Sequence, residues 1–267
     1  MDYAEWMPES TPHNPVVCCW SLRSEAAEAE AQGAEPALPD GCPELIFNFA
    51  DPFENVAANG RVMTQPAVFL VGQITRPFVL RPTGAVDLLA VRFEAHGAYG
   101  LHTDMSQLRD AWAEPIALRD TTLRDLAQRL ATTSGSQRRA EIHAWLAQYA
   151  LRAPRADDVV AAMVARIRET HGAVAIETLA ALHGLGMRTL QRRFAQQVGL
   201  SPKRFARIVR FHRVCLAWQE TPETLARVAV DSGYCDESHL IRDFRAFVGT
   251  PPATFLAALP EFTKLFL

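Results

Sequence analysis

Hydrophobic and polar positions follow two different periods along the chain, and the change falls near Leu101. Before it, short apolar runs are separated by Pro, Gly, Asn and Asp, a pattern typical of strands joined by tight turns. Asn59-Gly60 is expected to form a hairpin tip, and residues 21–40 are expected to form a loop with at most a frayed helical turn. Short strands punctuated in this way predict a small barrel or sandwich. The expected strands are Val16–Trp20, Glu44–Phe49, Ala67–Val71, Phe78–Leu80 and Val86–Phe93.

After Leu101 the apolar positions recur at helical spacing, and helices are expected over Thr122–Ala131 and Arg138–Leu151. The tripeptide Ala153-Pro154-Arg155 is the best linker candidate, because every later segment has helical character. We therefore predict an α+β fold class with two domains. Residues 1–153 would form a small β barrel with helices, and residues 154–267 an all-α domain.

An internal repeat in the helical part carries the strongest functional signal. The segment LAALHGL at 179–185 recurs as VAVDSGY at 228–234, and LQRRFAQQVGLSP at 190–202 recurs as LIRDFRAFVGTPP at 240–252. The first glycine of each copy can adopt the positive φ of a tight turn, and the second glycine, followed by proline, ends a helix. The repeat therefore predicts two helix-turn-helix units, over about 176–199 and 225–249.

The second helix of each unit has one apolar and one polar face at about 100° per residue. Leu190, Phe194 and Val198 share the apolar side of the first, and Leu240, Phe244, Phe247 and Val248 that of the second. Asp236 is expected to cap the second one. Arg and Gln match base edges in a major groove, Arg to guanine and Gln to adenine. The outward-facing candidates for DNA binding are Arg188, Thr189, Gln191 and Arg192 in the first unit and Ser238, Arg242 and Arg245 in the second.

A single helix over about 202–219, capped by Ser201, is expected to join the units. At about 1.5 Å per residue, this helix would space the two units rigidly. Two recognition helices about 34 Å apart would reach successive major grooves on one face of DNA. Phe205, Ile208 and Val209 would lie on its apolar face, and the arginines at 204, 207 and 210 are expected to keep their charge available.

Charge separates the two parts of a chain whose net charge is −3. Residues 1–153 hold 12 basic and 19 acidic residues, a net of −7, whereas residues 154–267 hold 15 and 11, a net of +4. No acid lies between Glu177 and Glu220, a window with eight Arg and Lys residues. Such a block indicates a phosphate-binding surface, although 25 Arg against 2 Lys in the chain also shows a compositional preference for arginine.

Two stretches, TLAALHGLGMRTLQRRFAQQVGLSPKRFARIVRFHRV and LARVAVDSGYCDESHLIRDFRAFVGTPPATF, resemble the AraC/XylS family of bacterial transcription regulators. The resemblance covers about residues 158–257 and implies seven helices, two helix-turn-helix units and sequence-specific binding to promoter DNA. Carried over by position, it implies base contacts from Arg188, Gln191 and Arg192 and from Glu237, Ser238 and Arg242, with His239 near a phosphate. Gly186 departs from the family's usual capping serine, and Glu237 would repel phosphate unless it accepts a hydrogen bond from cytosine.

The first half resembles an uncharacterised domain found fused to such regulators, through VVCCWSL, LPDGCPELIFNF and VGQITRPFVLRPTGAVDLLAVRFEAHGAYGL. The resemblance implies a cupin-like barrel and names no ligand. A small barrel can enclose one molecule. His96 and His102, with Glu94 or Asp104, lack the cupin spacing of metal ligands, so we expect no metal and no cofactor. Candidate ligand-binding residues are Trp20, Glu44, Phe47, Asn48, Gln73 and Arg92.

These patterns favour a sequence-specific DNA-binding transcription regulator, controlled by a small molecule or by self-association through its first half. We expect no enzymatic activity; the alternative is a cupin-like enzyme with a helical appendage. The expected partner is double-stranded promoter DNA, with RNA polymerase, a small-molecule effector and a second copy of the chain as further candidates. No apolar run is long enough for a transmembrane helix and the acidic, proline-containing start is unlike a secretory signal, so we expect a cytoplasmic protein without a membrane partner.

Overall fold

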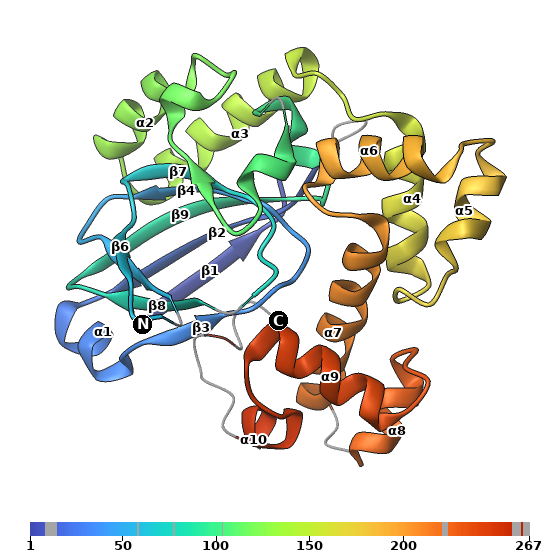
Figure 1. Cartoon of the computed structure of the whole chain (residues 1–267). Coiled ribbons are helices and arrows are strands. Elements are labelled where there is room, and N and C mark those ends of the chain that lie inside the picture. Colours follow the sequence, from blue (N-terminus) through green and yellow to red (C-terminus); the bar gives the residue numbers. More distant parts are fainter. Residues whose placement is uncertain are drawn as a thin grey trace.

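The computed structural model describes residues 1–8, 15–57, 59–76, 78–102, 104–220, 224–257 and 263. Its first half contains two β-sheets with helices on one side, and its second half is helical (Figure 1). The strands are β1 Asp2–Trp6, β2 Val16–Ser24, β3 Glu35–Ala37, β4 Glu44–Asn48, β5 Phe53–Val56, β6 Val62–Thr64, β7 Val68–Val71, β8 Phe78–Pro82, β9 Val86–Phe93 and β10 Trp112–Ala113. The α-helices are α1 Ala26–Gln32, α2 Leu123–Ala131, α3 Gly135–Arg152, α4 Asp158–Glu169, α5 Ile176–Leu182, α6 Met187–Val198, α7 Pro202–Glu220, α8 Leu225–Asp231, α9 Glu237–Val248 and α10 Pro252–Ala257.

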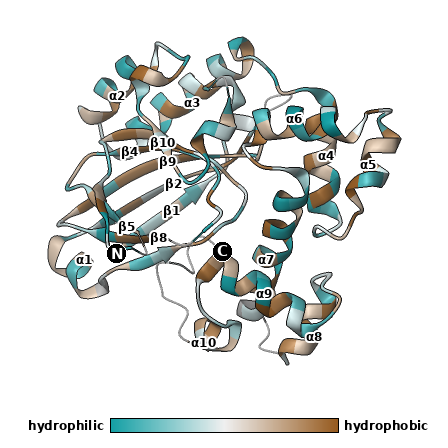
Figure 2. Cartoon of the chain, in the orientation of Figure 1, coloured by the Kyte–Doolittle hydropathy of each residue, from teal (hydrophilic) through white to brown (hydrophobic). Residues whose placement is uncertain are grey.

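The larger sheet has the order β1-β2-β9-β4-β7-β10 and the smaller the order β3-β8-β5-β6. Side chains alternate between the two faces of the larger sheet. On β4, Leu45 and Phe47 join the apolar core beneath α2 and α3, whereas Ile46 packs into a smaller core with Trp20 and Phe53. The larger sheet thus lies between α2 and α3 on one side and the smaller sheet on the other (Figure 1), and hydrophobic residues run along its central strands (Figure 2). This arrangement agrees with the predicted α+β class.

The expected strands and the hairpin at Asn59-Gly60 are present, and the hairpin joins β5 to β6 with Gly60 at φ 80°. The prediction of a loop over residues 21–40 is wrong. There β2 continues to Ser24 because Leu22 and Ser24 pair with the start of β9, and α1 and β3 follow. Sequence analysis also missed β1, which pairs along β2 from Asp2 to Trp6.

The expected helices correspond to α2 and α3, and the segment with Ala153-Pro154-Arg155 connects α3 to α4. The helical half packs directly on the sheets. A Cβ added to Gly199, at the end of α6, would come within 2.9 Å of the carbonyl oxygen of Met105 in the 3₁₀ helix η2 (Met105–Leu108). Ala95, which follows β9, is buried in the core of the helical half. Among the described residues, no helix is long and apolar enough to cross a membrane.

Residues from α4 to α10 share one apolar core. The long helix α7 lies at its centre and contacts α4, α6, α8 and α9. Because both helix-turn-helix units pack on α7 within this single core, their relative position is set by packed side chains rather than by a flexible connection.

Candidate nucleic-acid interface

The first helix-turn-helix unit is α5, a turn at Gly184 and α6. Gly184 has φ 61° and Gly199, which ends α6, has φ 89°. Leu190, Phe194 and Val198 are fully buried, as predicted from the helical period. The opposite side of α6 faces solvent. There Arg188, Gln191 and Arg192 are exposed, while Thr189 is half-buried.

The second unit is α8, a turn at Gly233 and α9. The Asp236 carboxylate accepts a hydrogen bond from the backbone N–H of His239 at 2.7 Å, so it caps α9 as predicted. Gly186 at the corresponding position before α6 offers no side-chain cap. The predicted apolar side of α9 is buried. On the other side Glu237, Ser238, Arg242 and Arg245 are exposed, and His239 is half-buried.

The helix α7 connects the two recognition helices through aromatic contacts. The ring of Phe205 lies 5.8 Å from that of Phe194 on α6, and the ring of Phe211 lies 5.0 Å from that of Phe244 on α9. The 19 residues of α7 give a rod of about 28 Å at about 1.5 Å per residue. Ser201 caps its start by accepting a hydrogen bond from the Arg204 N–H.

The expectation that the arginines at 204, 207 and 210 keep their charge available is wrong for Arg207, whose charge is paired with an acid. Arg204 and Arg210 keep their charge, although each donates to a backbone carbonyl. Arg207 forms an ion pair with Asp243 at 2.7 Å, Arg204 donates to the carbonyl of Thr75, and Arg210 donates to that of Gly172. Arg193 is likewise paired with Asp157, at 2.8 Å. Half of the acid-free basic block therefore holds the fold together. The sequence could not show this, because every one of these partners is distant along the chain.

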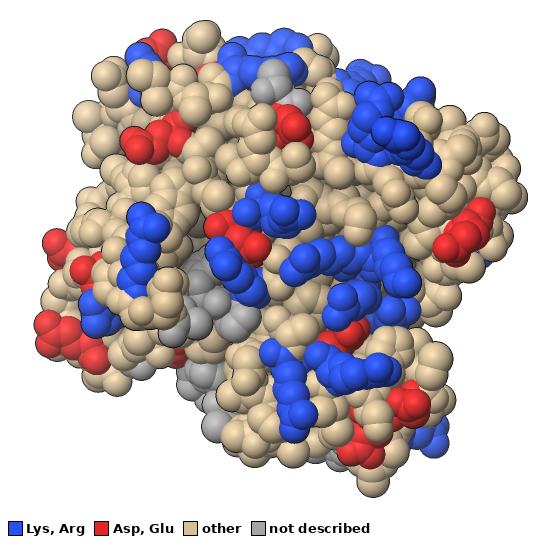
Figure 3. Space-filling view, viewed as in Figure 1, with Lys and Arg blue, Asp and Glu red and all other residues tan. Residues whose placement is uncertain are grey.

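The remaining basic residues of the block are Arg188, Arg192, Lys203 and Arg213, and no ion pair or side-chain hydrogen bond engages them within the described residues. The same holds for Arg242 and Arg245 on α9. Figure 3 shows Lys and Arg side chains gathered over α6, α7 and α9 on one face of the molecule, whereas the first half shows both signs of charge. A surface of unpaired arginines on two exposed helix faces can bind phosphates and base edges.

In the first half, three of the candidate ligand-binding residues meet at a cavity of about 100 Å³ between the two sheets, here called the inner cavity. The Glu44 carboxylate accepts hydrogen bonds from Trp20 Nε1 at 3.1 Å and from Arg92 Nε at 2.9 Å. Arg92 also forms an ion pair with Asp40 at 2.9 Å. Burial raises the pKa of Glu44 and raises the pKa of the Cys42 thiol to about 12.

The other three candidates lie elsewhere. Phe47 points to the opposite face of β4, into the core beneath the helices. Asn48 holds the turn after β4, where its side chain bonds the backbone of Ala50 and Asp51. Gln73 is buried and donates to the carbonyl of Gly41. Sequence analysis missed Asp40 as a lining residue because Pro39-Asp40-Gly41 has the composition of an ordinary turn.

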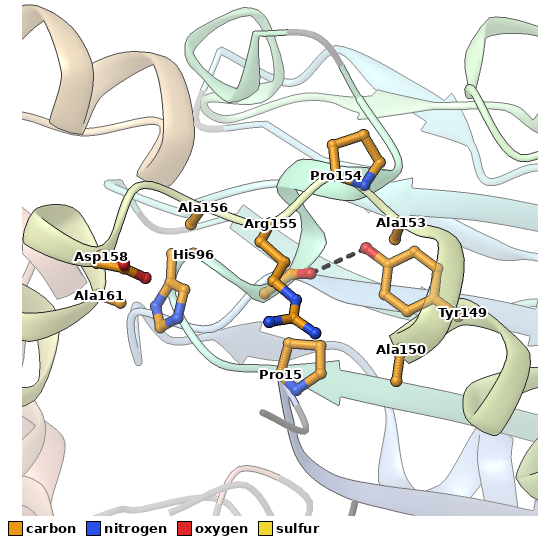
Figure 4. Close-up of a pocket in the computed structure, with 11 residues that line it drawn as sticks. Pro15, His96, Tyr149, Ala150, Ala153, Pro154, Arg155, Ala156, Asp158 and Ala161 are labelled. Carbon is orange, nitrogen blue, oxygen red and sulfur yellow. Dashed lines mark hydrogen bonds between the residues drawn. The ribbon is translucent and has the colours of Figure 1, made fainter. Parts of the chain in front are cut away.

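A second pocket, of about 110 Å³, lies where the predicted linker passes between the two halves (Figure 4). The Arg155 side chain extends into it, and Tyr149 closes one side by donating its hydroxyl to the carbonyl of Gly97 at 3.0 Å. His96 lies on the opposite side of the pocket, where burial lowers its pKa. Of the three linker residues, Ala153 packs against the core of the first half, whereas Pro154 and Arg155 are exposed.

The histidines considered as metal ligands do not come together. His96 lines the linker pocket, and His102 interacts with the backbone of Asp104 through Nδ1. Within the described ranges, no group of three or more His, Cys, Asp or Glu residues could hold a metal ion.

Comparisons with known families match both halves of the chain. Residues 179–258 match the family described as "Helix-turn-helix domain", and residues 5–114 match a "Domain of unknown function (DUF6597)". The HTH-type transcriptional regulator MtrA of Neisseria gonorrhoeae is 30% identical over 80 residues, which cover 30% of this chain. The matched stretch spans about a quarter of that relative, 27% of its length.

Solved structures also resemble the chain. The structure of ToxT from Vibrio cholerae has a TM-score of 0.47 and 7% identity, with 90% of this chain and 97% of that chain covered. ToxT with bound unsaturated fatty acid has a TM-score of 0.46 and 11% identity, with 88% and 94% covered. The AraC-like transcriptional activator CuxR has a TM-score of 0.21 and 12% identity, with 91% and 80% covered.

Proposed function

We propose, from the premise that residues 179–258 form a helix-turn-helix domain of the AraC type, that the protein is a sequence-specific, DNA-binding transcription regulator. One observation carries the proposal. The arginine-bearing faces of α6 and α9 are both exposed, while their apolar faces are fixed to a single rod, α7, in one core. Two recognition helices that are held by the single helix α7 are suited to bind successive major grooves on one face of DNA.

The residues divide by chemistry into base readers and phosphate anchors. Arg188 and Arg192, with Gln191 on the same exposed face of α6, have the donors and acceptors that match guanine and adenine edges. On α9, Arg242 is the corresponding base reader. Arg245, Thr189, Ser238 and His239 would contact backbone or adjacent bases, and Glu237 fits cytosine N4. The second unit therefore reads fewer bases than the first.

The first half is proposed to regulate DNA binding through a small molecule in its inner cavity. Three largely buried charged side chains and an indole N–H surround that cavity, and such convergent polar groups in an apolar pocket are typical of ligand sites. Self-association and contact with RNA polymerase remain predictions. A role at promoter DNA implies that the protein acts in the cytoplasm.

Selection of binding sites from random DNA with the full chain tests the function directly. We expect a recurring sequence with two half-sites about one helical turn apart. In gel shifts, the affinity for the selected site should fall by about 10³-fold between 50 and 200 mM salt if about six phosphates are contacted. Recovery of no common sequence, or binding that is insensitive to salt, would contradict the proposal.

Alanine substitutions distinguish residues that contact bases from residues that do not contact DNA. Arg192→Ala should weaken binding to the selected site by about 1–3 kcal/mol and relax base preference at one position. Arg166→Ala is the matched control, because Arg166 is an exposed arginine on α4 whose partner is Glu169 on the same helix. Equal losses on the selected site and on random DNA would show that Arg192 anchors phosphate and does not read a base.

A further inference from the structure

The inner cavity has one wall that belongs to both halves of the molecule. Residues 38–43, between β3 and β4, form this wall, here called the shared loop. Leu38, Asp40 and Cys42 line the cavity, and Leu38 also packs against the core of the helical half. A change in the cavity therefore acts on a segment that already touches the DNA-binding half.

The outer side of the shared loop carries α4 and α7. Arg168 on α4 donates hydrogen bonds to the Gly41 carbonyl and to the Cys42 sulfur, both at 3.3 Å, and pairs with Glu94 at 3.3 Å. Gly41, at φ 81°, lies so close to the Phe205 ring that an added Cβ would stand 2.8 Å from Cε2. Arg168 thus holds the shared loop against the rod between the two recognition helices.

The shared loop is tied equally firmly to the cavity. Asp40 accepts the backbone N–H of Cys42 at 2.9 Å and pairs with Arg92 inside the cavity at 2.9 Å. Arg92 in turn pairs with Glu44. A continuous series of contacts therefore leads from Glu44 in the cavity through Arg92, Asp40 and the loop backbone to Arg168.

The charge at the cavity selects the class of ligand. Two largely buried carboxylates, Asp40 and Glu44, whose side chains are each 14% exposed, share one guanidinium, that of Arg92. When both carboxylates are ionised, one negative charge is in excess. Arg168, on the far side of the shared loop, has Glu94 as its own partner. An anionic ligand would lie beside two carboxylates, whereas an ammonium group would compensate the excess charge and could also pack against Trp20. The side chains of Ile46, Leu80 and Leu88 line the cavity and would contact the apolar part of the ligand.

We propose that the inner cavity binds a compact organic cation, an amine on a small apolar body, and that the shared loop and Arg168 transmit its binding to α4 and α7. This proposal names the chemical class of the effector, and it rests on the proposed regulatory role of the first half. Filling the cavity fixes the Arg92–Asp40 pair, which orders the shared loop and tightens the packing of Arg168 and Phe205. Ligand binding and DNA binding are then linked reciprocally, because both depend on the same loop.

Calorimetric titration of the full chain with three probes of similar size tests the ligand class. The probes are 2-phenylethylamine, 2-phenylethanol and 3-phenylpropionate. We expect the amine to bind about tenfold more tightly than either other probe, because only it donates a charge-assisted hydrogen bond to a carboxylate of the cavity. No binding of the amine, or equal affinity for all three, would overturn the proposal.

Two variants locate the binding site. Glu44→Gln removes the excess charge at nearly constant volume and should reduce the preference for the amine to about twofold. If that variant does not fold, Ile46→Phe keeps the carboxylates, fills the cavity and should abolish binding. Ile116→Phe is its control, because Ile116 is exposed outside the cavity. Unchanged amine binding in Ile46→Phe would place the amine elsewhere and overturn the assignment.

Hydrogen exchange tests transmission without DNA. In the wild-type chain, the amine should slow amide exchange in the shared loop and also in α4 and α7 by about twofold or more. Arg168→Ala should retain amine binding and protection of the loop but lose the protection in α4 and α7, whereas Arg166→Ala should behave as wild type. If the amine slowed exchange in α4 and α7 of Arg168→Ala as much as in the wild type, transmission through Arg168 would be refuted. Because no DNA is present, these outcomes are independent of whether the protein regulates transcription.

Discussion

The two helix-turn-helix units repeat the same turn and the same buried side but are anchored differently. In both, a glycine with positive φ makes the turn and another ends the recognition helix. Arg193 in the first unit corresponds to Asp243 in the second. Arg193 pairs with Asp157, the residue that caps α4 just after the linker, whereas Asp243, only 2% exposed, pairs with Arg207 on the rod.

This difference assigns separate roles to the repeats. The first unit contacts the other half directly, since Gly199 lies against Met105, and it is also fixed to the start of α4, where Gln197 accepts the backbone N–H of Asp157. The second unit is tied to α7 by Asp243 and Phe211. A movement of the first half therefore reaches α6 directly and reaches α9 through the rod. The two copies share the side chains that form the turn and the buried side, and they differ at the anchoring position, Arg193 against Asp243.

The largest expected effect comes from removing the aromatic contact between the rod and the second unit. Phe211 is fully buried, and its ring contacts those of Phe244 and Phe247 at 5.0 and 5.2 Å. Phe211→Ala should lower the free energy of unfolding by about 3–5 kcal/mol, because it loses apolar burial and leaves a cavity. Urea denaturation followed by circular dichroism measures this loss.

Hydrogen exchange on the same variant sharpens the comparison. Amides of α9 should lose more protection than those of α6, which keeps its own contact between Phe194 and Phe205. Leu182→Ala is a suitable control, because Leu182 is exposed on α5 and its truncation should change stability by less than about 0.5 kcal/mol. Equal loss in α6 and α9 would mean that the two units open as a single body.

The next effect concerns DNA recognition by the two units. If the first reads more bases, Arg192→Ala should cost about 2–3 kcal/mol of specific binding and Arg242→Ala about 1 kcal/mol. Both residues are exposed and neither has an ion pair within the described part of the chain, so truncation should leave the fold unchanged. Titration of each variant against the selected site and single-base variants of it measures the difference. A larger loss from Arg242→Ala would reverse the assignment.

The repeat made the second half largely predictable from the sequence. Positions such as Leu190 and Leu240 are buried because the helical period dictates it, and glycines such as Gly199 and Gly249 end helices because they adopt positive φ. The pairing of Arg207 with Asp243 was not predictable, since it depends on how α7 packs on α9. A count of arginines therefore overstated the surface available to phosphate.

The first half was less predictable because strand pairing depends on distant segments. β1 exists because β2 offers it a complete antiparallel edge, and α1 fills a segment whose composition indicated a loop. Alternation along β4 correctly directs Glu44 to one face but could not show that Asp40, in a turn, reaches the same cavity. Likewise, only the packing of α4 brings Arg168 to the shared loop.

A smaller effect is expected from the cap of the second recognition helix. Asp236→Ala removes the acceptor of the His239 N–H and should reduce the free energy of unfolding by about 1 kcal/mol. Asp236→Asn keeps an acceptor and should restore most of that stability. Urea denaturation of the wild type and the two variants measures the difference. Indistinguishable midpoints would show that this cap adds nothing to the stability of α9.

The smallest effect reverses the comparison by giving the first unit the cap that it lacks. Gly186 precedes α6 with φ −67° and ψ 141°, an extended conformation that serine adopts readily. Apart from the adjacent residues, no atom in the described part of the chain lies within 4 Å of a Cβ built there, so the serine side chain fits without displacement. Gly186→Ser should therefore raise the free energy of unfolding by a few tenths of a kcal/mol and slow amide exchange in the first turn of α6.

Because the exposed residues that follow, Arg188 and Arg192, lie within the first two turns, a more stable start to α6 should also tighten specific DNA binding without altering the preferred sequence. An altered sequence preference would mean that Gly186 itself lies against the DNA.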